Sequence, residues 1–192
     1  MTTLAVVQAG LGSPSSTQLL ATRLAEATER LVPGLEVRTT HLRDVARDIA
    51  DNLVTGFPSA RLREVVESVV GADAVIAVTP TFNASYSGLF KSFVDVLEPG
   101  SLAGKPVLIG ATGGTERHSL VLDHALRPLF AYMRAIVVPT GVYAASSDWG
   151  AEGLPGRVDR AAGELADLLV GRAPAKPATT DFVPFDQLLA GR

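Results

Sequence analysis

The feature that most constrains the fold of this chain is a regular alternation of short apolar runs with longer segments of helical periodicity. Five runs rich in Val, Ile and Ala have the length of buried strands. They span residues 4–9, 35–40, 74–79, 106–111 and 135–142. Because the runs are apolar almost throughout, we expect them to be buried on both faces, as strands of a parallel sheet are.

The segments between these runs have the spacing of helices that pack one face against a sheet. In residues 16–31, for example, Leu20, Leu24 and Ala27 follow one another at intervals of four and three residues. The expected helices span residues 16–31, 60–70, 87–97, 119–133 and 158–171. This alternation predicts an α/β fold, a doubly wound sandwich with helices on both faces of the sheet and right-handed crossovers.

Five strands fit a flavodoxin-like parallel sheet of order 2-1-3-4-5 better than a six-stranded dinucleotide fold. Such a sheet binds its ligand beyond the carboxyl ends of the strands. We therefore expect the function in the loops that follow the first, third and fourth strands.

The composition indicates one folded domain and excludes several functions. Of 192 residues, 47% are hydrophobic and 19% charged, enough for a buried core and unlike a disordered chain. The 17 Lys and Arg residues are scattered and the net charge is −3, so we expect no nucleic-acid partner. The chain has no Cys, which excludes disulfides and thiolate metal sites, and its three dispersed His residues predict no metal site.

The two ends of the chain carry different expectations. The N-terminus has no basic region before its apolar run, and no apolar stretch approaches the roughly 20 residues of a membrane helix. We therefore expect a cytoplasmic protein without a membrane partner. Residues 1–172 are expected to form the domain, and residues 173–180 a linker rich in Pro, Ala and Thr. Residues 181–192 carry enough apolar side chains to predict a tail that docks on a protein surface.

The first of the three loops, residues 10–17 (GLGSPSST), has the composition of an anion site. Its glycines allow a tight turn, its hydroxyls can donate to phosphate oxygens, and the helix that follows offers free N–H groups. Alternatively, Ser15 or Ser16 is an N-cap and the glycines form only a turn. The loop matches neither a P-loop nor a GxGxxG motif, which disfavours nucleoside triphosphates and dinucleotide folds.

The second and third loops suit a flat ligand with polar edges. Residues 79–88 (TPTFNASYSG) combine a Pro, short polar side chains and two aromatic rings. Residues 111–115 (ATGGT) have paired glycines, whose peptide N–H groups can approach ring carbonyls and nitrogens. Alternatively, residues 79–88 are an ordinary strand-to-helix loop with Ser87 as N-cap and buried aromatics, and residues 111–115 a flexible turn.

Three segments carry a resemblance to a known family: residues 12–20 (GSPSSTQLL), 79–95 (TPTFNASYSGLFKSFVD) and 102–128 (LAGKPVLIGATGGTERHSLVLDHALRP). With them the chain resembles the NADPH-dependent FMN reductases, above all the reductase partners of two-component, luciferase-like flavin monooxygenases. The resemblance implies non-covalently bound FMN, with its phosphate at the first loop, its ribityl chain and rings at the second, and its pyrimidine end at the third. The residues that match these flavin contacts are Ser13, Ser15, Ser16, Thr17, Pro80, Thr81, Phe82, Asn83, Tyr86, Ser87, Thr112, Gly113, Gly114 and Thr115.

The resemblance also implies an activity, hydride transfer from NADPH or NADH to FMN. The cofactors perform this chemistry, so we expect no catalytic side chain. Many members have an Arg in the first loop, which this chain lacks, so we expect Ser hydroxyls and backbone groups alone to hold the phosphate and the flavin to leave readily. Two alternatives are a flavin-retaining quinone or azo reductase and, in a different class, a non-enzymatic electron carrier. The near-neutral charge disfavours the carrier.

The resemblance further implies a homodimer or homotetramer, and a flavin-dependent monooxygenase as the possible partner that receives reduced flavin. We expect residues 181–189 to take part in assembly, although packing within one subunit would also bury them. At the position of His124 the resemblance implies an interface helix, so we expect a subunit contact or a helix distortion there.

Overall fold

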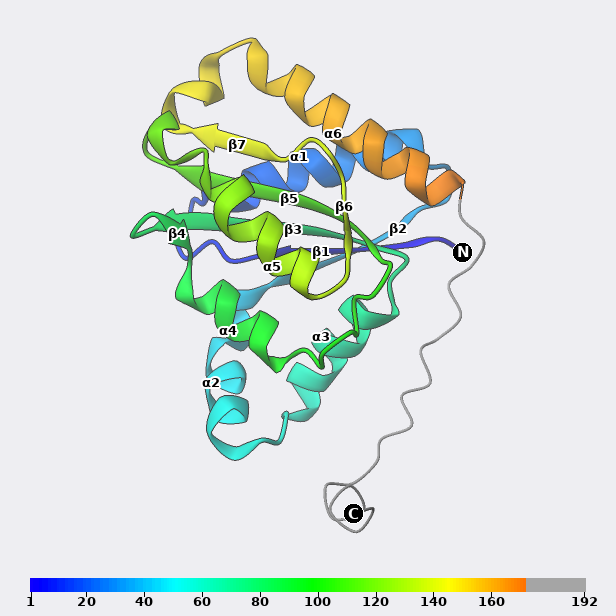
Figure 1. Ribbon diagram of the computed structural model, residues 1–192, viewed down its shortest axis with the longest axis vertical. Helices are drawn as coiled ribbons and strands as arrows, with labels where there is room; N and C mark the ends of the chain where they lie inside the picture. The colour runs from blue at the N-terminus through cyan, green and yellow to red at the C-terminus, as the bar shows by residue number, and fades with distance from the viewer. Residues whose placement is uncertain (172–192) are drawn as a thin grey trace.

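The computed structural model describes residues 1–171, which form a parallel sheet covered by helices on both faces (Figure 1). The main path of the sheet has the order β2-β1-β3-β5-β6, while β4 pairs with β3 and β7 with β5. The predicted flavodoxin-like order is confirmed, but the sheet has seven strand segments rather than five. The strands are β1 (Thr3–Gln8), β2 (Glu36–His41), β3 (Ala74–Phe82), β4 (Ser85–Tyr86), β5 (Pro106–Gly113), β6 (Ile136–Val137) and β7 (Val142–Ala145).

Within residues 1–171, two helices cover one face of the sheet and four cover the other. The first pair is α1 (Ser16–Leu31) and α6 (Gly153–Val170). The opposite face carries α2 (Ala46–Thr55), α3 (Ala60–Gly71), α4 (Gly88–Val96) and α5 (Arg127–Tyr132). The short elements are η1 (Leu42–Val45), η2 (Glu116–His118), η3 (Leu122–Leu126) and η4 (Ser146–Gly150). The helix α2 was not among the expected elements.

Alternation along the strands divides the core into two clusters. In β1, Leu4 and Val6 pack under α1 and α6, whereas Ala5 and Val7 face the other helices. All four side chains are at most 3% exposed, so both faces of this strand are buried. Each large apolar side chain buried in this way contributes about 1.5–3 kcal/mol to folding. The near-continuous apolar runs therefore mark central strands, as the sequence predicts.

The predicted fifth strand, residues 135–142, is wrong as a single element. It is divided into β6 and β7, which both pair in parallel with β5. Pro139 has no N–H to donate, and the Thr140 backbone N–H and hydroxyl both donate to the Glu164 carboxylate at 2.6 Å. The Val138 N–H still donates to the Val107 carbonyl of β5 at 3.0 Å, but the contacts of Thr140 turn the chain toward α6, and pairing resumes at Val142.

The second predicted loop is largely a β-hairpin. The strand β3 continues through Pro80 to Phe82 and turns back into β4, with Thr81 opposite Tyr86. The turn residues Asn83 and Ala84 have φ angles of 47° and 65°, as a type I′ turn requires. Pro80 has no N–H to donate to β1. Because β1 pairs with β3 only as far as Val78, no ladder hydrogen bond is lost at this position.

Two further expectations concern the rest of the chain. The helix expected at residues 119–133 is distorted, because η3 is a π-helical turn that contains His124 and leads into α5. No helix within residues 1–171 is long and apolar enough to cross a membrane. The predicted linker and tail, residues 173–192, lie outside the described residues.

Candidate functional site

The strands β1, β3 and β5 run parallel and end at the same edge of the sheet, on the left in Figure 1. The three loops singled out from the sequence follow these ends, and the structure brings them together there. A hydrogen bond of 2.8 Å joins the hydroxyls of Thr17 and Thr112, which come from the first and third of these segments. Both side chains are buried, so this bond fixes the start of α1 against the end of β5.

The first loop presents unpaired donors at the N-terminus of α1. Ser15 is the N-cap, and its hydroxyl accepts a hydrogen bond from the Gln18 N–H at 3.2 Å. Among the described residues, nothing accepts a hydrogen bond from the N–H groups of Ser16 and Thr17. The side chains of Ser13 and Ser16 are exposed. The first turn of a helix attracts anions, and these donors suit a phosphate.

A buried side chain holds the base of this loop. Gln8, at the end of β1, accepts a hydrogen bond from the Gly10 N–H through Oε1 at 2.7 Å. Its amide nitrogen lies 2.5 Å from Nδ1 of His41, at the end of β2. A Cβ on Gly10 would overlap the Ser15 hydroxyl, so this glycine is needed where the loop folds back on its own N-cap.

The hairpin between β3 and β4 offers two side chains to a ligand. Phe82 is 46% exposed and Asn83 is exposed at the turn. Tyr86 is half-buried and packs on Phe90 with 6.1 Å between ring centroids. Ser87 is the N-cap of α4 and accepts a hydrogen bond from the Phe90 N–H at 3.2 Å. This contact is the capping role that the sequence left as an alternative for Ser87.

The two glycines of the third loop have different surroundings. A Cβ on Gly113 would overlap the hydroxyl of Tyr143, which donates to the Thr115 carbonyl at 2.8 Å. A Cβ on Gly114 would meet no atom within 4 Å. Gly113 therefore lets the neighbouring strand β7 approach closely, whereas Gly114 borders open space. No described residue accepts a hydrogen bond from the N–H groups of Gly114 and Thr115.

Burial governs the chemistry of Tyr143. The side chain is 4% exposed, and burial raises the pKa of its phenol above the ordinary value. The negative charges of Asp148 and Glu116 act in the same direction, whereas the nearby Thr81 hydroxyl opposes them. That hydroxyl is itself buried and has no hydrogen-bond partner among the described residues. Tyr143 is thus a neutral donor that fixes the third loop.

The predicted site residues fall into two groups. Those that reach solvent at the site or leave donors unpaired there are Ser13, Ser16, Phe82, Asn83, Gly114 and Thr115. Those that are buried or engaged within the protein are Ser15, Thr17, Pro80, Thr81, Tyr86, Ser87, Thr112 and Gly113. The second group builds the edge on which the first group is exposed.

Sequence reasoning missed Arg43, an exposed cation beside the first loop. Its Nη1 donates to the Leu11 carbonyl at 2.8 Å. Arg43 lies in η1, directly after β2, and β2 pairs with β1 along its whole length. A cationic side chain thus lies beside the first loop, in addition to the Ser hydroxyls and backbone groups of the loop itself. The signal was the strand order, which places residues after the second strand next to those after the first.

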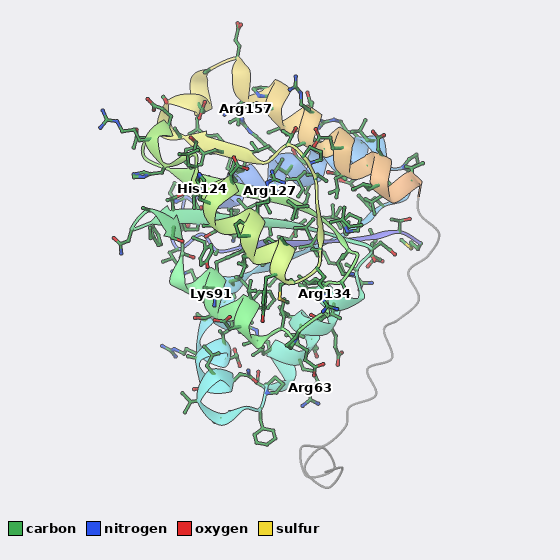
Figure 2. All side chains as sticks on the ribbon, in the orientation of Figure 1. Arg63, Lys91, His124, Arg127, Arg134 and Arg157 are labelled. Carbon is green, nitrogen blue, oxygen red and sulfur yellow. The ribbon has the colours of Figure 1, made fainter. Side chains whose placement is uncertain are left out.

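A second arginine anchors the segment beyond β7. Arg157 of α6, labelled in Figure 2, donates to the Asp148 carboxylate at 2.6 Å and to the Tyr143 carbonyl at 3.0 Å. The Arg23 guanidinium lies 5.1 Å from the centroid of the Trp149 ring. These contacts hold η4 against α1 and α6. Within residues 1–171 no group of three His, Cys, Asp or Glu residues could hold a metal ion.

Comparison with known proteins identifies the family. Residues 2–150 match the model of the NADPH-dependent FMN reductases. The chain belongs to this family. Residues 12–20, 79–95 and 102–128, which carried the resemblance, all lie within the match. This reductase is therefore an oxidoreductase with FMN as its flavin and a reduced nicotinamide as co-substrate, as the sequence predicts.

The sequence similarity to individual relatives covers most of their length. The reductase is 37% identical over 172 residues to an FMN reductase (NADPH) of Pseudomonas aeruginosa, covering 87% of this chain and 92% of the relative. It is also 37% identical over 139 residues to the NADH-dependent FMN reductase SfnF of Pseudomonas putida, covering 72% and 75%. An oxidoreductase of known structure from Corynebacterium diphtheriae superposes with a TM-score of 0.88 at 45% identity, covering 90% of this chain and 99% of that one.

Proposed function

We propose that this chain holds FMN non-covalently at the carboxyl edge of its sheet and reduces it there with NADPH or NADH. The observation that carries this placement is the convergence of unpaired donors and an exposed aromatic ring at one edge. The N–H groups of α1, the open glycine at position 114 and the half-exposed Phe82 surround the same strand ends. FMN supplies the hydride-accepting ring when it is bound.

The donor set fits the three parts of FMN. The hydroxyls of Ser13 and Ser16 and the first N–H groups of α1 bind the phosphate. Asn83 and Phe82 would contact the ribityl chain and the rings. The N–H groups of Gly114 and Thr115 would hold the pyrimidine end and stabilise negative charge that develops on reduction. No side chain needs to act as a nucleophile or to donate a proton for hydride transfer.

The buried residues position this set. The bond between Thr17 and Thr112 holds the first and third loops at a fixed separation, and Tyr143 holds Thr115. The cap formed by Ser87 starts α4 directly behind the hairpin. Such preorganised support lets backbone donors act without reorganising when the ligand arrives.

We further propose that reduced FMN leaves the site and supplies a flavin-dependent monooxygenase. An exposed hairpin and short hydroxyl side chains suit a flavin that exchanges with solvent. The names of relatives support nicotinamide oxidation, with NADPH in one case and NADH in another. We place the protein in the cytoplasm, where reduced nicotinamides and reduced thiols coexist, in keeping with a chain without Cys.

The proposal includes a homodimer or homotetramer. The helical segment around η3 and α5 exposes Leu120 at 59% and Tyr132 at 83%. His124, which Figure 2 labels on this segment, is exposed as well. Leaving a large apolar side chain in water forgoes about 1.5–3 kcal/mol of burial. Contact between two copies through this segment would recover that energy.

Steady-state kinetics tests the proposed reaction. The purified protein is assayed for bound flavin, and NADPH or NADH oxidation is then followed with FMN varied as substrate. We expect saturable turnover of added FMN and little flavin retained after gel filtration. Activity only with a quinone or azo acceptor, together with tightly bound flavin, would support a flavin-retaining reductase instead.

A further inference from the structure

We propose that Arg43 binds the terminal phosphate of the flavin and makes the site selective for FMN over riboflavin. The inference rests on the proposed placement of FMN and adds a residue from outside the three loops. The motive is the hydrogen bond from Arg43 Nη1 to the Leu11 carbonyl, which holds a guanidinium against the first loop.

The fold directs Arg43 to this position. Gln8 and His41 are register partners at the ends of β1 and β2, so the residues after β2 emerge beside the first loop. Leu42 is fully buried and Val45 is 2% exposed, and together they anchor η1 in the core. Arg43 lies between these anchors and is exposed. Its backbone is therefore fixed while its side chain remains free to contact a ligand.

Most of the guanidinium remains available. The bond to Leu11 uses one N–H of Nη1. Within residues 1–171, the guanidinium of Arg43 forms no other hydrogen bond, and no carboxylate there forms a salt bridge with it. A guanidinium has five N–H donors in a planar fork that matches a phosphate. The remaining donors lie beside the loop that offers the N–H groups of Ser16 and Thr17.

Several other arginines contact groups away from the first loop. Arg23 stacks on Trp149, and Arg157 pairs with Asp148. Arg127 donates to the carbonyls of Val138 and Pro139. Figure 2 shows Arg63 and Arg134 toward the opposite edge of the molecule from the strand ends. Among the described arginines, Arg43 is the one whose side chain forms a hydrogen bond to the first loop.

Arg43 changes the balance of binding energy between flavins. A phosphate monoester carries between one and two negative charges near neutral pH, which helix N–H groups and hydroxyls compensate only in part. A charge-assisted bond from a guanidinium is shorter and stronger than a neutral one. Riboflavin lacks the phosphate and makes no such bond, so Arg43 favours FMN.

The test compares the wild-type protein with Arg43→Gln for binding of FMN and riboflavin by fluorescence titration. Glutamine keeps an N–H donor for the Leu11 carbonyl and removes the charge. We expect FMN to bind about 10- to 100-fold more weakly, the equivalent of one charge-assisted hydrogen bond, with riboflavin unchanged. The variant's FMN affinity should also depend less on salt. Arg43→Lys should restore part of the affinity because it restores the charge.

The control is Arg47→Gln, which removes an exposed positive charge one helical turn further on with no bond to the first loop. We expect nearly unchanged FMN affinity in this variant. Equal weakening of FMN and riboflavin in Arg43→Gln, or equal losses in both variants, would overturn the proposal. Steady-state turnover of FMN by the wild-type protein, followed through NADPH or NADH oxidation, tests the proposed function separately. Normal FMN affinity in Arg43→Gln would overturn the role of Arg43 while leaving that function intact.

Discussion

At the scale of single residues, neighbouring glycines have unlike roles in the third loop. Gly113 is required because the Tyr143 hydroxyl occupies the place of its side chain. Gly114 has no such neighbour, and its backbone does not adopt the left-handed conformation that favours glycine. The fold thus accounts for Gly113, whereas the proposed flavin accounts for Gly114.

Gly114→Val is expected to fold normally and to lose FMN, because a branched side chain would occupy the space proposed for the ring edge. Gly113→Ala is expected to lower the free energy of unfolding by about 1–3 kcal/mol, since Tyr143 must move. Urea unfolding and the visible absorbance of the reconstituted proteins measure the two effects. Normal flavin absorbance in a folded Gly114→Val protein would remove this loop from the site.

Tyr143 is expected to titrate above the ordinary range of tyrosine, because burial disfavours the phenolate. A raised pKa in the folded protein means that the protonated phenol stabilises the fold. This contribution is complete below about pH 10, the unfolded value, and is lost as the pH rises through the higher folded value. The phenolate absorbance of the wild-type protein minus that of Tyr143→Phe isolates the titration. A difference curve centred at or below the unfolded value would contradict the assignment.

At the scale of elements, the β3–β4 hairpin holds an unusual residue at its turn. Ala84 has a φ of 65°, a left-handed conformation that is unfavourable for a residue with a Cβ. Glycine adopts this conformation freely and is common in type I′ turns. The strain belongs to the element that presents Phe82 and Asn83.

Ala84→Gly is therefore expected to raise the free energy of unfolding by about 0.5–1 kcal/mol, measured on the flavin-free protein by urea titration. Ala50→Gly is the matched control, because Ala50 is exposed in the interior of α2. It should lower the free energy of unfolding by about 1 kcal/mol. Destabilisation of similar size in both variants would show that the turn is not strained at Ala84.

Elements were predicted best where a periodic pattern is long and uninterrupted. The bounds of α1 agree with the expectation, because apolar spacing and the Ser15 cap both mark them. Residues 135–142 were predicted as one strand because they are mostly apolar. The prediction was wrong because Thr140, after Pro139, turns toward Glu164. The helix α2 was missed because its sequence is polar and only Ile49 of it is fully buried.

At the scale of the whole molecule, we expect residues 181–189 to take part in a homo-oligomer. Truncation after Ala173 should lower the mass of the assembly in solution, measured by size-exclusion chromatography with light scattering. The physical reason is the burial of the large apolar side chains in this segment, each worth about 1.5–3 kcal/mol.

A second, full-length variant replaces Phe182 and Phe185 with Ser. It should lower the mass of the assembly as the truncation does. An intact oligomer with unchanged flavin affinity in the truncated protein would show that these residues do not take part in assembly.

The sequence by itself determined the fold class, the strand order and the position of the three loops. The positions of the strands, helices and loops are local information, because hydrophobic periodicity and turn residues act over a few neighbouring positions. The strand order followed from matching the number of strands to the flavodoxin-like fold. Family resemblance in the same segments determined the flavin and the reaction, which the match over residues 2–150 confirms.

Only the tertiary structure decided which side chains meet at the edge of the sheet. Thr17 meets Thr112, Tyr143 closes over Gly113, and Arg43 reaches Leu11 across 32 positions of the chain. These contacts depend on the register between strands and on the packing of helices, which bring together residues distant in sequence. No local pattern encodes such a meeting, because each partner alone is an ordinary polar or aromatic residue after a strand.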